Sequence, residues 1–555
     1  MTQLSPTDAS NIGATRPVVV VDANGSTAID HWTEALGESR VIVDSKTLKS
    51  FSANAIGSSI VPIAVLRPAR AEQVQKIVGI AAEQQVAIYP ISTGRNWGYG
   101  AASPVRDGCA VLDLSDLRQI RVIDDELGVL ELEPGVTQGM LAEYLQRHGI
   151  DRMVPVHGGG PDCSLVGNAL ERGYGLTPTT DHFLALTSLQ AVLPDGSTYR
   201  SGFHAMGAER IGASHRWGVG PYVEGLFSQG NFGVVTSATF ALQRKPQHTE
   251  AFFVRLRDQD QFEETVESIR TLLGDLDGVL TGVNLMNDRR VLSMSREYPR
   301  DRVAAGGIMS RELVDELLGE SGATAWTLAG IIQSPSALIS PLRKHLRRAL
   351  PPGVARPFLV NRRRIAIGRR VVQSVPLAGS SVLQQLDSIE AFLDLAEGMP
   401  RRVALSLAYW LDGHRPDVSQ SLNPAKDHCG LIWYSPLVPM KRDVVRDYVH
   451  MVETVCESHG IEPLITLTSL SERLFDSTVP ILYRKSETGA ADRAQACYEA
   501  LYDAGKQLGC LPYRVTTQSM GRVAADGFDN HFDFVSRLKQ AIDPSGIVAP
   551  GRYSS

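Results

Sequence analysis

The chain has 555 residues, a formal net charge of −6 at pH 7 and an apolar content of 43%. At this length two or more domains are expected, with enough apolar side chains to bury a core in each. The mildly acidic balance gives no support to binding of nucleic acid or of an acidic membrane.

No segment offers the roughly 20 consecutive apolar residues that a membrane span needs. Residues 1–17 are polar and lack the basic and apolar regions of a secretory signal. The six cysteines lie far apart with no C-x-x-C pair, which predicts neither a metal site nor a disulfide framework. We therefore expect a cytoplasmic protein with reduced thiols.

The first third of the chain alternates short strands and helices. Apolar runs bounded by Gly, Pro and Asp predict strands at residues 41–43, 60–68, 86–90, 109–114, 120–124 and 129–133. Apolar side chains at helical spacing predict helices over residues 70–84 and 137–145. This layout is typical of an α+β domain.

A glycine-rich loop follows the strand that ends at Tyr89-Pro90. Its glycines permit positive φ and a close backbone approach, so that successive N–H groups can converge on an anion. Hydroxyl groups and one positive charge add to these donors, and a phosphate-bearing cofactor is the ligand that the loop favours. The residues concerned are Ser92, Thr93, Gly94, Arg95, Gly98 and Gly100. A simple turn is the alternative, because no established phosphate-loop template is matched.

After this loop the composition and the predicted secondary structure change twice along the chain. Residues 151–180 are rich in Gly, Pro and Thr and predict a second loop that approaches a ligand closely. Strands resume at 186–193, with a hairpin signal at 194–197, and at 234–242. Beyond Arg244-Lys245-Pro246 a strand at 252–256 and a helix at 262–273 open a long mixed α/β region, which we expect to be a second domain.

The loop sequence Pro-x-Ser-Thr-Gly-Arg-Asn-x-Gly-Tyr-Gly-x-Ala-x-Pro, residues 90–104, resembles the pyrophosphate loop of the vanillyl-alcohol oxidase and p-cresol methylhydroxylase flavoproteins. The 4-phenol-oxidising branch of that family is the most similar. Further motifs of the family occur in family order: Glu133-Pro134-Gly135-Val136-Thr137, Val166-Gly167-Asn168, Thr177-Pro178-x-x-Asp181-His182-Phe183, Gln229-x-Asn231-x-Gly233 and Asp543-Pro544-x-Gly546-Ile547.

The resemblance implies a PCMH-type FAD-binding domain of two α+β subdomains and a large α/β cap domain that holds substrate. It places an N-terminal arm at residues 1–45, the FAD-binding domain at 46–245, the cap at 246–490 and a segment that completes the flavin site at 491–555. The cofactor contacts that it implies are Ser92, Thr93, Gly94, Arg95, Asn96, Tyr99, Gly100, Ala101, Gly167, Asn168, Gly233, Val235 and Arg552.

Tyr513-Arg514 is similar to the family's active-site Tyr-Arg pair. An arginine beside the flavin can stabilise negative charge, and a tyrosine hydroxyl can hydrogen-bond a substrate oxygen. Outside this context, such a dipeptide is more often an amphipathic surface pair.

The sequence also departs from the family pattern. Members with His-linked flavin carry histidine where Leu431 stands, and His428 is off register, so we expect non-covalent FAD. The carboxylate that the 4-phenol-oxidising branch places near flavin N5 aligns with Gly158-Gly159-Gly160 and is absent. His157 and Asp162 flank this gap and are the candidate bases, although each can equally be structural.

The phenol-binding tyrosine of the N-terminal region is also missing, because Phe51-Ser52-Ala53-Asn54-Ala55 occupies its place. A plain 4-alkylphenol is therefore not the expected substrate. We expect an FAD-dependent oxidoreductase that takes a hydride from a carbinol, amine or benzylic carbon of an aromatic or heteroaromatic small molecule onto flavin N5.

O₂ or another acceptor would then reoxidise the flavin, and a homodimer is a further expectation that the resemblance implies. Two alternatives remain at this stage: an aliphatic alcohol or sugar oxidase of the same fold, and a flavin-binding pseudoenzyme without catalysis.

Overall fold

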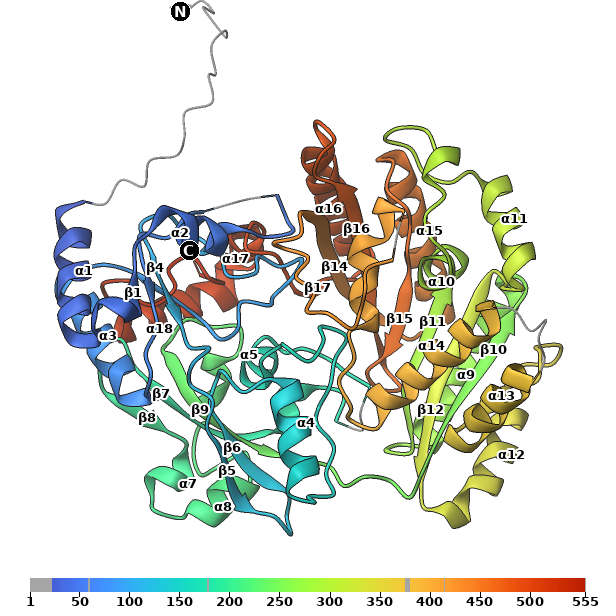
Figure 1. Ribbon diagram of the computed structural model, residues 1–555, viewed down its shortest axis with the longest axis horizontal. Coiled ribbons are helices and arrows are strands. Elements are labelled where there is room, and N and C mark those ends of the chain that lie inside the picture. The colour runs from blue at the N-terminus through green and yellow to red at the C-terminus, as the bar shows by residue number, and fades with distance from the viewer. Residues whose placement is uncertain (1–21, 58–59, 177–178, 375–379, 414, 555) are drawn as a thin grey trace, which may run out of the picture.

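The computed structural model describes residues 22–57, 60–176, 179–374, 380–413 and 415–554. The first 21 residues of the expected arm and the Thr177-Pro178 part of one motif lie outside these ranges. Two lobes stand side by side, each built on its own β-structure and helices (Figure 1). This combination of helices and sheets confirms the predicted α+β class.

A four-stranded sheet forms one layer of the first lobe, in the order β1-β2-β4-β3. Strands β2, β4 and β3 run parallel, and β1 is antiparallel to β2. The strands are β1 (Val41–Ile42), β2 (Val65–Leu66), β3 (Ile88–Ile91) and β4 (Ala110–Asp113). Helix α3 (Ala71–Gln84) buries Val74, Ile77, Val78 and Ala81 along one stripe, as its apolar spacing predicts. Helices α1 (Ala23–Leu36) and α2 (Ser45–Ser52) precede it, and α1 packs against α3.

The second sheet of this lobe is antiparallel, in the order β5-β6-β9-β7-β8. Its strands are β5 (Ile120–Asp124), β6 (Val129–Leu132), β7 (Leu186–Val192), β8 (Thr198–Arg200) and β9 (Val234–Ala241). The hairpin predicted at 194–197 joins β7 to β8. Around this sheet lie the helices α4 (Gln138–Arg147), α5 (Leu165–Leu170), α6 (His182–Ala185), α7 (Gly202–Ala205) and α8 (Glu209–Ser214).

One eight-stranded sheet organises the second lobe, in the order β13-β10-β12-β11-β15-β16-β14-β17. Its strands are β10 (His248–Leu256), β11 (Leu280–Asn287), β12 (Trp326–Ser334), β13 (Phe358–Val360), β14 (Cys429–Pro439), β15 (Thr466–Ser469), β16 (Leu474–Arg484) and β17 (Pro512–Arg514). Its helices are α9 (Gln259–Asp275), α10 (Asp288–Ser295), α11 (Arg311–Ser321), α12 (Ile339–Ala349), α13 (Arg362–Ser374), α14 (Ser380–Ala396), α15 (Arg442–Ser458) and α16 (Ala490–Gln507).

The end of the chain belongs to both lobes (Figure 1). Helix α16 and strand β17 pack with the second lobe, whereas α17 (Met520–Asp526) and α18 (Asp533–Ile542) return to the first. There, Ile547 O accepts from Ile88 N at 2.8 Å, and Ile88 O accepts from Ala549 N at 2.8 Å, which extends the parallel sheet beside β3. The residue limits predicted for the four domains stay a prediction. Among the described helices, none combines the length and hydrophobicity that a bilayer crossing requires.

Phe262 tests the core of the second lobe, because it is fully buried and stacks on Trp326 with ring centroids 4.1 Å apart. Phe262→Ala is expected to lower the free energy of unfolding by about 3–5 kcal/mol, through lost burial and a residual cavity. Urea unfolding followed by circular dichroism measures the change. Phe534→Ala, at a side chain that is 54% exposed, serves as the control and should change stability by less than about 0.5 kcal/mol. Equal effects of the two variants would contradict this account of the core.

Candidate active site

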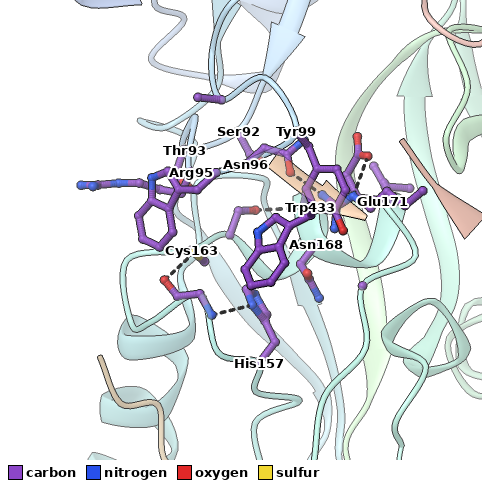
Figure 2. A pocket seen from close by; sticks show the side chains of 18 of the residues that line it. Ser92, Thr93, Arg95, Asn96, Tyr99, His157, Cys163, Asn168, Glu171 and Trp433 are labelled. Atoms are coloured by element: carbon purple, nitrogen blue, oxygen red, sulfur yellow. Dashed lines mark hydrogen bonds and ion pairs between the residues drawn. The ribbon is translucent and has the colours of Figure 1, made fainter. Parts of the chain in front are cut away.

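A cavity of about 480 Å³ lies where the two lobes meet, within the size range of small-molecule and cofactor sites. Its walls come from the glycine-rich loop after β3, from the 156–176 segment, from the sheet of the second lobe and from residues 548–552. Figure 2 shows Ser92, Thr93, Arg95 and Asn96 on one side and His157, Cys163 and Asn168 on the other.

The glycine-rich loop presents free donors to this cavity. Gly94 has a φ of 63°, and a Cβ there would lie 3.1 Å from the Ala102 methyl group, so the tight turn suits glycine. The hydroxyls of Ser92 and Thr93 line the cavity, and within the described part of the chain neither has a protein hydrogen-bond partner. Hydroxyl and guanidinium donors on a glycine turn are the groups that bind a pyrophosphate.

The facing wall comes close to this loop because Gly167, in the first turn of α5, has no side chain. A Cβ at Gly167 would lie 2.1 Å from Ser92 Oγ. The turn of α5 is held by Ser164, whose hydroxyl accepts a hydrogen bond from Gly167 N at 2.9 Å. The loop and the α5 turn therefore form one cradle, and its shape and donors fit the phosphate-bearing part of FAD.

Most of the predicted cofactor contacts come together around the cavity. Those that line it are Ser92, Thr93, Gly94, Arg95, Asn96, Tyr99, Ala101, Gly167, Asn168, Gly233, Val235 and Arg552. Gly100 does not line the cavity. Its φ is 132°, and a Cβ there would lie 2.5 Å from the Thr517 side chain, so its role is to let the loop pass Thr517.

Tyr513 and Arg514 lie on β17 and line the cavity, so this pair is not on the surface. The Tyr513 ring packs on Tyr174 with centroids 4.8 Å apart. Arg514 lies over the Tyr99 ring, 4.3 Å from its centroid, and donates to Asn96 Oδ1. Burial holds the pKa of Tyr513 well above its ordinary value, so its hydroxyl keeps its proton and is available as a donor.

Glu171, which the sequence did not single out, connects the Tyr-Arg pair to the end of the chain. Its carboxylate forms ion pairs with Arg552 and, at 3.4 Å, with Arg514 Nε. Burial alone would raise the pKa of Glu171, but the charges of Arg552 and Arg514 outweigh it and hold the pKa below its ordinary value. Both arginines are therefore partly neutralised by one partly buried carboxylate.

His157 lines the cavity, but its surroundings oppose protonation. Burial, with a smaller contribution from the charge of Arg514, lowers the pKa of His157 to about 3. Gly159 N lies 3.1 Å from Nδ1, and the Gln138 amide nitrogen, which donates to Gly160 O, lies 3.2 Å from Nε2. An imidazolium would thus place its two N–H groups against two other donors, so His157 is ill suited to accept a proton near neutral pH.

Asp162 does not line the cavity. It accepts a hydrogen bond from the Ser421 hydroxyl at 3.1 Å and pairs with Arg402 at 3.4 Å, so it connects the first lobe to the second. The sequence places Asp162 beside the glycine gap, but the chain turns at Gly160, where φ is 91°. The expectation of a base at this position therefore finds no support in the geometry.

Asp476 on β16 lines the cavity, as Glu171 does, but it has no ion-pair partner among the described residues. The residue is only 7% exposed, and its Oδ1 is buried without a hydrogen-bond partner among the described residues. Burial raises the pKa of Asp476 to about 7, and the charge of Arg514 offsets part of this shift. A carboxyl group with this pKa can accept a proton near neutral pH. The signal in the sequence is an aspartate directly after two apolar residues in a mostly buried strand, in the run Leu474-Phe475-Asp476.

Leu431, which stands where His-linked members carry histidine, lines the cavity on β14. His428 precedes that strand with a φ of 61° and is not among the lining residues.

The chain is similar to known flavoproteins in sequence. A model of the FAD binding domain family matches residues 62–202. The 4-cresol dehydrogenase [hydroxylating] flavoprotein subunit of Pseudomonas putida is 26% identical over 97% of this chain and 97% of its own. The 1'-carboxy-chondrochloren decarboxylase of Chondromyces crocatus is 33% identical over 95% of this chain and 96% of its own. The chain belongs to the p-cresol methylhydroxylase-type flavoprotein family.

Two solved structures show that this flavoprotein has the family's fold. A substrate-bound p-cresol methylhydroxylase superposes with a TM-score of 0.84 at 24% identity, over 96% of this chain and 97% of the other. The 4-ethylphenol oxidase of Gulosibacter chungangensis gives a TM-score of 0.84 at 23% identity, over 96% and 98%. The predicted fold, FAD as cofactor and oxidoreductase activity are thus confirmed.

Gly167→Ala tests the cradle of this flavoprotein, because the added methyl group must displace the Ser92 hydroxyl or the loop that carries it. Loss of a hydrogen bond to a charged group predicts FAD binding that is weaker by about tenfold or more. FAD titration of the apoprotein measures the affinity. Gly79→Ala in α3 is the matched control, since nothing lies within 4 Å of a Cβ there, and it should bind FAD unchanged. Equal affinities in both variants would remove Gly167 from the cofactor site.

Proposed function

We propose that this flavoprotein oxidises a small aromatic or heteroaromatic molecule by removing a hydride from a carbinol, amine or benzylic carbon. The observation that carries the proposal is the grouping of Asp476 with Tyr513 and Arg514 on one wall of the cavity. Burial is the main cause that raises the pKa of Tyr513, and the charge of Asp476 adds to it, so the two side chains act on the same small volume.

Each of these residues has a distinct task. Bound FAD supplies the hydride acceptor, N5 of the flavin. Tyr513 donates a hydrogen bond to a substrate oxygen, and Arg514 stabilises negative charge that develops there. Asp476 accepts the proton of the substrate O–H or N–H, so that loss of a hydride and a proton completes a two-electron oxidation. O₂ or another acceptor then takes up the electrons.

The relatives support an aromatic substrate, because the names of two of them contain 4-cresol and 4-ethylphenol, which are phenols. In this chain the carboxyl group on the cavity wall without an ion-pair partner among the described residues is Asp476, which makes it the candidate base. The alternative of an aliphatic alcohol or sugar oxidase is tested by turnover of polyols with none of aromatic alcohols. The cytoplasmic location and the homodimer stay predictions.

The proton-acceptor role of Asp476 predicts a pH profile with a defined sign. A base works only when ionised, so flavin reduction by substrate should speed up as pH rises through about 7, the pKa of Asp476. Asp476→Asn should remove this rise and slow reduction by about 10²–10⁴-fold, the usual contribution of a general base. Anaerobic stopped-flow bleaching of the flavin absorbance between pH 5 and 9 measures both effects.

Asp162→Asn is the control for this experiment, because Asp162 binds Arg402 and Ser421 outside the cavity. It should keep the rise near pH 7 and most of the rate. A profile that Asp476→Asn leaves unchanged, or that Asp162→Asn abolishes, would refute the assignment of the base.

We also propose that FAD is held without a covalent bond, since Leu431 lines the cavity at the position of the linking histidine and His428 does not line it. Acid precipitation of the holoenzyme is expected to release the yellow colour into the supernatant. Flavin that stays with the washed pellet would overturn this proposal. The Leu431→His variant supplies a comparison, because it restores the linking side chain at the lining position.

A further inference from the structure

Arg290 is a cation in the cavity wall without a carboxylate partner in the described part of the chain. It lies in the first turn of α10, where Asn287 caps the helix by accepting from Arg290 N at 3.1 Å. Its guanidinium donates through Nε to the Thr466 hydroxyl at 3.2 Å and through Nη1 to the Ser293 hydroxyl at 3.0 Å. Both partners are neutral. Nη2 and one N–H of Nη1 remain for a ligand.

The two residues that precede Arg290 both form ion pairs, whereas Arg290 forms none with the described residues. Asp288 pairs with Arg311 at 2.5 Å, and Arg289 pairs with Glu462 at 2.6 Å. Burial lowers the pKa of Arg290 to about 10, and no acidic group counteracts this shift. The guanidinium is still charged at neutral pH. Arg290 is partly buried, and a charge withdrawn from water is costly unless it is paired, so this position is suited to bind an anion.

The sheet register shows how far Arg290 lies from the Tyr513-Arg514 pair. Thr466, which holds Arg290 Nε, pairs with Thr478 across β15 and β16. The next strand, β14, brings Ser435, which pairs with Arg514 on β17. Three inter-strand steps correspond to roughly 14 Å between the backbones of Thr466 and Arg514. The two arginines therefore serve opposite ends of one cavity, and Asp476 on β16 lies between them.

We propose that Arg290 binds a carboxylate of the substrate, at the end of the cavity remote from Tyr513 and Arg514. A planar guanidinium with three N–H groups left for a ligand can bind a carboxylate through two of them. This inference rests on the proposed function for what happens at the other end, where the aromatic part is oxidised. It also accounts for a site that departs from plain alkylphenol oxidation, because an alkylphenol offers nothing to Arg290.

Binding measurements on the FAD-loaded enzyme test this assignment. The probes are 4-hydroxyphenyl acetate, propanoate and butanoate, their methyl esters, and the phenyl acids that lack the hydroxyl group. Affinities are measured by isothermal titration calorimetry at pH 7.5. The native enzyme should prefer the acid of best length over its ester by about tenfold or more, as for a hydrogen bond to a charged group.

Arg290→Met should abolish this preference by weakening acid binding while ester binding stays within about threefold. Arg290→Lys, which keeps the charge, should keep part of the preference and covers the case in which the methionine variant does not fold. Arg537→Met removes the same charge at a side chain that is 71% exposed, and it should keep the full preference.

Two outcomes overturn the inference: no preference for acids in the native enzyme, or a preference that survives in Arg290→Met. The proposed function fails separately, if acids with and without the hydroxyl group bind alike and neither acids nor esters bleach the flavin. In that case the dependence on Arg290 would still identify a carboxylate site.

Discussion

The ion pairs of the partly buried Glu171 carboxylate are the interactions on which the site depends. Glu171 follows α5 in the first lobe, and it pairs with Arg514 on the sheet of the second lobe and with Arg552 at the end of the chain. Three segments that are far apart in the sequence are thereby fixed around one cavity. A buried pair of this kind contributes little net stability but strongly disfavours arrangements that leave a charge unpaired. Its main effect is therefore to specify how the two lobes meet.

The charged groups on the cavity wall fall into two sets, those that are paired within the protein and those that are not. Arg514 and Arg552 share Glu171, so neither acts as a full positive charge. Outside the glycine-rich loop, the charged groups on the wall without such compensation among the described residues are the Asp476 carboxyl and the Arg290 guanidinium. A protein that only needed to be stable would have paired or removed them. Groups of this kind mark the part of the cavity that meets substrate.

The spacing of neighbouring residues predicted the strands, helices and loops whose structure depends on local sequence. The strand at 86–90, the helix at 70–84 and the loop from Ser92 to Asn96 are found close to where the spacing of apolar residues and glycines placed them. The site was harder, because Glu171 and Arg514 are separated by hundreds of positions and no nearby pattern encodes their contact. Asp162 shows a second limit of sequence proximity, since it is close to the glycine gap in the sequence but follows the turn at Gly160 and pairs with Arg402 outside the cavity lining.

Burial makes Asp476 a better base than a surface aspartate, and the reason is electrostatic. Its ionised form lacks the hydration that water would give, and the charge of Arg514 offsets only part of that loss. Taking up a proton therefore removes an unfavourable buried charge, and this gain assists proton removal from the substrate. His157 is the opposite case, because burial and Arg514 both oppose its charged form. The same desolvation thus favours proton uptake by the carboxylate and opposes it at the imidazole, which decides between two side chains that both line the cavity.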